Sequence, residues 1–78
     1  MQTKVLVKMQ NQERSLERLM AKVRESEYQV RNLSARLSLD ESVFFLTLEV
    51  EGERSAADLS SNLNAMSEVT SVEMNPAA

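Results

Sequence analysis

The order in which two hydrophobic periodicities follow one another is the strongest constraint on the fold of this chain. Apolar residues alternate with polar ones near both ends of the chain and in two central segments, and they recur every three or four residues in the two segments between. Alternation is typical of a half-buried strand, and the longer spacing is typical of an amphipathic helix. The 78 residues therefore predict the order strand, helix, strand, strand, helix, strand.

The first strand is predicted over residues 4–9 and the first helix over 13–26. Asn11 is the expected N-cap of this helix, because its side-chain oxygen can accept a hydrogen bond from a free backbone N–H. The apolar residues share one face in each element. They are Val5, Val7 and Met9 in the strand, and Leu16, Leu19, Met20 and Val23 in the helix.

Two neighbouring strands are predicted over residues 28–39 and 43–51, and the short polar link Asp40-Glu41 makes them a hairpin. The first strand changes phase between Val30 and Leu33, which a β-bulge would reconcile. In the second strand, alternate residues should face the helices. Those expected inside are Phe44, Leu46, Leu48 and Val50, and those on the other face are Val43, Phe45, Thr47, Glu49 and Glu51.

The second helix should start near Ser55, because Ser55 and Asp58 have the spacing of a capping box. Residues 69–74 then supply the last strand. We expect one domain over residues 1–75 and a frayed tail at 76–78. The apolar stripe of the second helix is Ala56, Leu59, Leu63 and Met66.

This order of elements predicts an α+β fold, the ferredoxin-like βαββαβ sandwich, with a four-stranded antiparallel sheet and both helices on one face. The other face and the edge strand over residues 28–39 would remain uncovered. Long exposed edges are normally blunted or paired, and a chain this short buries only about 60% of its unfolded surface. We therefore expect a homodimer that pairs through the edge of the second strand.

Several classes of function are disfavoured by composition. The chain has no cysteine and no histidine, which excludes disulfides, thiolate nucleophiles, Cys/His zinc sites and Ser-His-Asp triads. The net charge of −3 disfavours nucleic acid as a partner. No apolar run approaches the length of a membrane helix, and no leader is recognisable. We expect a cytoplasmic, non-catalytic protein with no metal and no cofactor.

One constellation could bind a ligand, namely the turn over residues 9–15 between the first strand and the first helix. A helix N-terminus presents free N–H groups and positive potential, so it can hold a small carboxylate such as that of an amino acid. The alternative interpretation is a capped helix start without a ligand.

Four stretches resemble a known family. They are Val5-Leu6-Val7, the turn and helix over 11–23 with Leu16-Glu17-Arg18-Leu19, the segment Tyr28-Gln29-Val30-Arg31-Asn32-Leu33, and the stretch from Leu63 to Val69. Here the chain resembles an ACT domain and, within that family, the small regulatory subunit of acetohydroxyacid (acetolactate) synthase. The resemblance implies a dimer that activates a large thiamine-diphosphate-dependent catalytic subunit in branched-chain amino acid biosynthesis.

The resemblance also implies an effector site at the dimer interface, where the first turn of one copy meets the second strand of its neighbour. Asn11 matches a turn Asn that contacts the ligand, and Gln29 matches an Asn on the second strand. Arg14 and Glu27 stand where the family has glycine, which lets backbone approach a ligand closely. Arg14 therefore implies weak or absent feedback inhibition. The expected effector residues are Asn11, Gln12, Glu13, Arg14 and Gln29.

Three functions stay open, in decreasing order of preference. The first is the regulatory subunit of acetohydroxyacid synthase, with a branched-chain amino acid as a possible effector. The second is another ACT-type interaction or dimerisation module that regulates a different enzyme of amino-acid metabolism. The third is a small enzyme on the same fold, such as an acylphosphatase, but the chain has no Gly-rich phosphate-binding loop with an arginine beside it.

Overall fold

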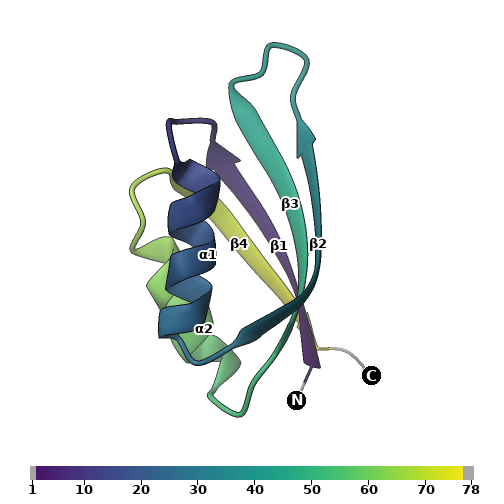
Figure 1. Cartoon of the computed structure of the whole chain (residues 1–78), viewed down its shortest axis with the longest axis vertical. Helices are drawn as coiled ribbons and strands as arrows, with labels where there is room; N and C mark the ends of the chain where they lie inside the picture. Colours follow the sequence, from purple (N-terminus) through teal and green to yellow (C-terminus); the bar gives the residue numbers. More distant parts are fainter. Residues whose placement is uncertain (1, 77–78) are drawn as a thin grey trace.

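Six elements follow one another in the order expected from the sequence (Figure 1). The computed structural model describes residues 2–76. The strands form one antiparallel sheet in the order β2-β3-β1-β4. The predicted ferredoxin-like βαββαβ fold is confirmed. The elements are β1 (Gln2–Gln10), α1 (Ser15–Glu25), β2 (Gln29–Leu37), β3 (Val43–Glu51), α2 (Ala56–Asn64) and β4 (Val69–Pro76).

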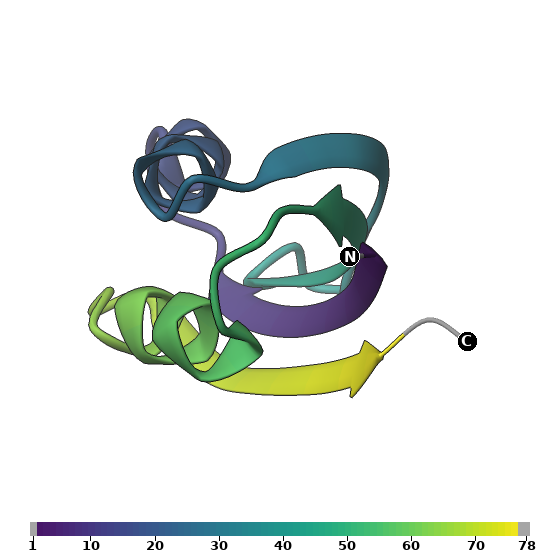
Figure 2. The same ribbon diagram turned by 90° about the horizontal axis from the view of Figure 1, so that it is seen from below.

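Both helices lie on the same face of the sheet, with α1 on the side of β2 and α2 on the side of β4 (Figure 2). The inward residues of the two central strands meet the helices and form the core, as their alternation predicts. Ala56, expected on the stripe of α2, is instead exposed, because it is the first residue of the helix. The buried core includes Val5, Val7, Met9, Leu19, Val23, Leu46, Leu48, Val50, Leu59, Leu63 and Met66.

The predicted β-bulge lies in β2. Val30 pairs with Val50 and Asn32 pairs with Glu49, so Arg31 is the extra residue. An extra residue restores the phase of the side chains, which puts Leu33 on the same face as Val30. As an edge strand, β2 exposes seven of its nine residues.

The two helices begin in different ways. The Ser55 hydroxyl accepts hydrogen bonds from the backbone N–H groups of Ala57 and Asp58, so α2 is capped where the sequence predicts. The predicted cap of α1 is wrong. Arg14 occupies the N-cap position in a left-handed conformation (φ 60°) and makes no side-chain cap. Asn11 lies too far upstream and is bonded to the β2–β3 turn instead.

The last strand is longer than expected. In β4, Asn75 pairs with Lys4 and Pro76 pairs with Thr3, because β1 begins early enough to offer them partners. The tail predicted at 76–78 thus overlaps the strand at Pro76. Residues 77 and 78 lie outside the described residues.

The β2–β3 turn is organised around the carboxylate of Asp40. Its Oδ1 accepts hydrogen bonds from the Ser42 hydroxyl at 2.7 Å, the Ser38 hydroxyl at 2.8 Å and the Ser42 backbone N–H at 3.1 Å. The Ser38 hydroxyl in turn accepts from the backbone N–H of Val43. These bonds, led by that of the Ser42 hydroxyl, lower the pKa of Asp40 from 3.8 to about 2. The turn is therefore stabilised by the ionised form of Asp40.

We expect Asp40 to make the stability of the fold depend on acid pH. Its pKa is lower in the folded chain, so its contribution is complete above its unfolded pKa of 3.8 and is lost as the pH falls toward 2. Asp40→Asn should lower stability at neutral pH and flatten the stability profile between pH values of 3.8 and 2. Urea unfolding across this range measures both effects.

Glu41→Gln is the matched control, since it removes the neighbouring exposed carboxylate and should keep the slope of the natural protein. The pKa of Glu68 is also lowered, by its own backbone N–H first and then by Arg18, and it contributes the same slope to all three proteins. Parallel profiles for Asp40→Asn and the natural chain would contradict the assignment.

Candidate functional site

The predicted effector residues lie at opposite ends of the sheet. Asn11, Gln12, Glu13 and Arg14 form the turn between β1 and α1, whereas Gln29 is the first residue of β2. Gln10, before the turn, pairs with the first residue of β3, and Gln29 pairs with the last one. A single chain therefore does not bring the turn and Gln29 together.

The β1–α1 turn is held by the β2–β3 turn. The backbone N–H of Asn11 donates to the carbonyl of Ser42 at 2.9 Å, and Nδ2 of Asn11 donates to the carbonyl of Glu41 at 2.8 Å. Gln12 Nε2 donates to Oε1 of Gln10 at 2.7 Å. The side chain of Asn11, expected to contact a ligand, thus already joins the two turns through its Nδ2.

A buried carboxylate supports the other side of this turn. Glu68, which is only 5% exposed, has its carboxylate 2.5 Å from Nη2 of Arg18 on α1. The backbone carbonyl of Glu68 accepts a hydrogen bond from the N–H of Gln10 at 2.7 Å. Sequence reasoning missed this contact because fifty residues separate the two partners.

Both positions where the resemblance expects glycine have a left-handed backbone. Arg14 has a φ of 60° and Glu27 a φ of 64°, a conformation that costs an ordinary residue about 1–2 kcal/mol. Next to Arg14, the hydroxyl of Ser15 is buried and has no hydrogen-bond partner within residues 2–76. The start of α1 thus combines a strained residue with an unsatisfied hydroxyl.

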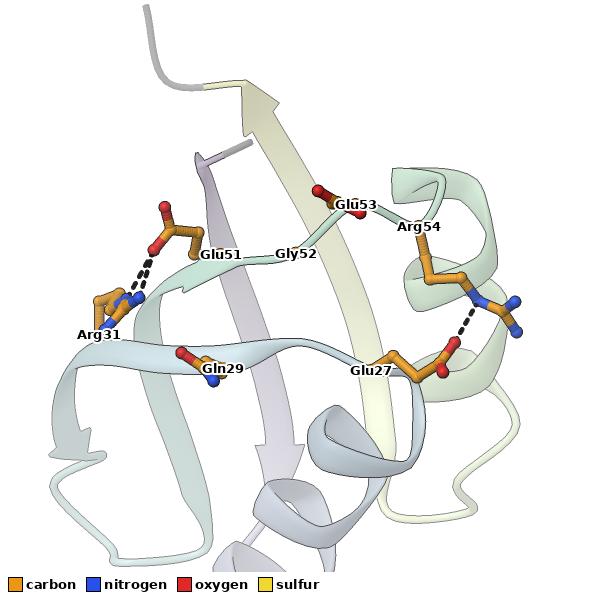
Figure 3. A pocket seen from close by; sticks show the side chains of 7 residues that line it. All are labelled: Glu27, Gln29, Arg31, Glu51, Gly52, Glu53 and Arg54. Atoms are coloured by element: carbon orange, nitrogen blue, oxygen red, sulfur yellow. Dashed lines mark hydrogen bonds and ion pairs between the residues drawn. The ribbon is translucent and has the colours of Figure 1, made fainter.

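At the other end of the sheet, Gln29 lines a polar cavity of about 500 Å³ (Figure 3). Two ion pairs flank it, Arg31 with Glu51 at 2.5 Å and Arg54 with Glu27 at 2.9 Å. All four side chains are exposed enough that each pair contributes little to stability. They can therefore exchange partners with the ammonium and carboxylate of a zwitterion. The lining residues are Glu27, Gln29, Arg31, Glu51, Gly52, Glu53 and Arg54.

Gly52 allows one wall of this cavity to form. A Cβ at Gly52 would lie 2.8 Å from Cδ1 of Tyr28 and 2.9 Å from the carbonyl oxygen of Glu27. The buried Tyr28 donates its hydroxyl proton to the carbonyl of Arg54. The loop after β3 thus packs closely on Tyr28, and this contact positions Arg54 for its pair with Glu27.

Residues 2–76 contain neither a cluster of metal ligands nor a membrane-spanning helix. No three carboxylate, histidine or cysteine side chains gather there as metal ligands would. No helix in this part of the chain is long and apolar enough to cross a membrane.

A family model described as an ACT domain matches residues 11–72. No curated protein matches the chain in sequence. Solved structures with a similar fold include the ACT domain from GTP pyrophosphokinase of Chlorobium tepidum, which is 10% identical with a TM-score of 0.78 over 95% of this chain and 96% of that one.

Other solved structures with a similar fold belong to different proteins. A formyltetrahydrofolate deformylase from Pseudomonas putida is 11% identical, with a TM-score of 0.75 over 99% of this chain but only 29% of that one. The C-terminal domain of the MgtC protein from Mycobacterium tuberculosis is 12% identical, with a TM-score of 0.68 over 97% and 86%. At such identities the likeness shows the fold alone.

We expect Gly52→Ala to lower the free energy of unfolding by about 1–3 kcal/mol, the usual cost of inserting a methyl group into a packed contact. Urea unfolding measures the loss. Glu53→Ala is the control, because it changes the next, exposed residue and should stay within about 0.5 kcal/mol of the natural chain. Equal stability of Gly52→Ala and Glu53→Ala would mean that the contact with Tyr28 is not close.

Proposed function

Since this chain belongs to the ACT domain family, we propose that it is the small regulatory subunit of an acetohydroxyacid (acetolactate) synthase. The family match over residues 11–72 is the observation that carries the proposal, because it makes the domain a regulatory module. In this role the chain is non-catalytic and cytoplasmic. It binds a large thiamine-diphosphate-dependent subunit of branched-chain amino acid biosynthesis and raises its activity.

The four stretches that resemble this subunit class support the choice within the family. Two of them contain the regions where an effector would bind, namely the β1–α1 turn with α1 and the segment from Tyr28 through the bulge of β2. The resemblance therefore covers both parts of the expected effector site.

Homodimerisation through β2 would complete the effector site. Antiparallel pairing about a twofold axis near Leu33, the middle residue of β2, sets the start of one β2 beside the end of the other. The β1–α1 turn lies at the same end of the sheet as Leu37. Gln29 of one copy thereby approaches the Asn11 turn of its neighbour, which one chain alone does not achieve.

A second candidate is an ACT module that regulates a different enzyme of amino-acid metabolism. The solved structures support this candidate because similar domains occur in two other enzymes, a GTP pyrophosphokinase and a formyltetrahydrofolate deformylase. The two candidates share the fold, the dimer and the effector site, and they differ in the catalytic partner.

Reconstitution with the large synthase subunit of the same host tests the choice. We expect the rate at which that subunit condenses two 2-oxo acids to rise with added chain and then to saturate, while the chain alone has no turnover. An unrelated ACT domain is the control for nonspecific stabilisation. A flat titration would eliminate the first candidate in favour of the second.

We expect calorimetry to detect weak or no binding of valine, leucine or isoleucine to the natural chain. Arg14 occupies a left-handed position of the turn where a side chain limits the approach of a ligand to the backbone. Arg14→Gly should bind at least one of these amino acids more tightly. Tight valine binding by the natural chain that is lost in Arg14→Gly would mean that the guanidinium binds the effector carboxylate.

A further inference from the structure

The tip of the β2–β3 hairpin, residues 37–42, carries two leucines that no other part of the described chain covers. Leu39 is fully exposed and Leu37 is 39% exposed. The hairpin projects beyond the end of the sheet at which α1 begins (Figure 1). An exposed leucine at the end of a projecting hairpin is suited to enter a pocket on another molecule.

The hairpin tip is well ordered by hydrogen bonds. The Ser38 N–H donates to the carbonyl of Val43 at 2.8 Å, and the Glu41 N–H donates to the carbonyl of Ser38 at 2.9 Å. The Asp40 carboxylate and Asn11 Nδ2 add the bonds described above. A preorganised tip loses little conformational entropy when it binds.

The same chain has a groove of about 620 Å³ between the C-terminal half of α1 and the start of β2. Its apolar surface comes from Met20, Tyr28 and Val30, and Met20 and Val30 are only half-buried. The groove opens beside the edge strand. The lining residues are Met20, Arg24, Glu27, Tyr28, Gln29 and Val30.

Antiparallel pairing of two β2 strands about Leu33 would bring the tip and the groove together. Such pairing sets the Leu37 end of one β2, and beyond it Leu39, beside the bulged start of the other β2 at Gln29 and Val30. The bulge puts Leu37, which pairs with Phe44, on the same helix-covered face as Val30. The apolar tip and the groove therefore lie on the same side of the combined sheet.

Charges of the two surfaces are complementary. Arg24 lines the groove and has no ion pair within the described part of the chain, whereas Glu27 is paired with Arg54. The tip carries the carboxylates of Asp40 and Glu41 next to Leu39. The carboxylates of the hairpin tip are therefore attracted to Arg24 in the groove of a second copy.

We propose that the hairpin tip of one copy, anchored by Leu39, docks into the α1–β2 groove of a second copy, and that two such reciprocal contacts set the register of the dimer. This inference rests on the edge-to-edge dimer of the proposed function. It adds a specific recognition element to strand pairing, which by itself tolerates slippage where side chains are exposed.

Analytical ultracentrifugation of Leu39→Ala tests the docking. We expect the dimer dissociation constant to rise on the order of 25-fold, because truncation of an interface anchor costs about fivefold at each of two symmetric sites. Phe45→Ala is the matched control, since Phe45 is an exposed apolar residue on the open sheet face and its truncation should leave the constant unchanged.

Charge reversal is a second test of the docking. Arg24→Glu and Glu41→Lys should each weaken the dimer, and the double variant should restore it.

Disulfide trapping provides a readout that does not depend on affinity. The natural chain has no cysteine, so Leu39→Cys mixed with Met20→Cys should form a crosslink between copies on mild oxidation, and Phe45→Cys mixed with Met20→Cys should not. A dimer whose affinity is unchanged in Leu39→Ala and that gives no crosslink would overturn the docking but leave edge pairing intact. A natural chain that stays monomeric at all concentrations would overturn the dimer itself.

Discussion

The extra residue at Arg31 is the constraint on which both the sheet and its edge depend. Without it, Val30 and Leu33 would point to opposite faces, and half of β2 would lose its contact with the helix side. With it, the whole strand keeps one apolar side. Arg31 has no partner residue on β3 in the ladder, and its side chain donates to the carboxylate of Glu51 beside the cavity. One insertion thus shapes the core, the cavity and the surface that a second copy would meet.

The sequence predicted most of this architecture because strand alternation and helical spacing report on burial directly. The bulge was predictable as well, since one inserted residue is what moves the apolar positions of a strand from one parity to the other. The cap of α1 was not predictable in the same way. Asn11 has the right residue type, but the helix begins only after Arg14, and the Asn11 side chain donates from Nδ2 to the distant carbonyl of Glu41 instead. A local pattern does not contain such a long-range partner.

The residues that shape the candidate site were harder to identify than the fold. Gly52 follows a strand and suggests only that the strand ends, whereas the packed structure shows that Tyr28 leaves no room for a side chain there. Nothing in the sequence around Glu68 distinguishes it from the exposed acidic residues, yet its side chain is buried against Arg18. Arg14 was notable only because a family pattern has glycine there, and the positive φ now gives the physical reason for that glycine.

The hydrogen bonds of Asn11 join the β1–α1 turn, where an effector would bind, to the tip of the β2–β3 hairpin. Its N–H and Nδ2 bond the carbonyls of Ser42 and Glu41, so the effector turn and the hairpin tip with Leu39 are connected directly. In the proposed dimer, a ligand that shifts the turn would also move the tip relative to the groove of the neighbour. Effector binding and dimer affinity would then be coupled, and by thermodynamic linkage each would change the other by the same factor.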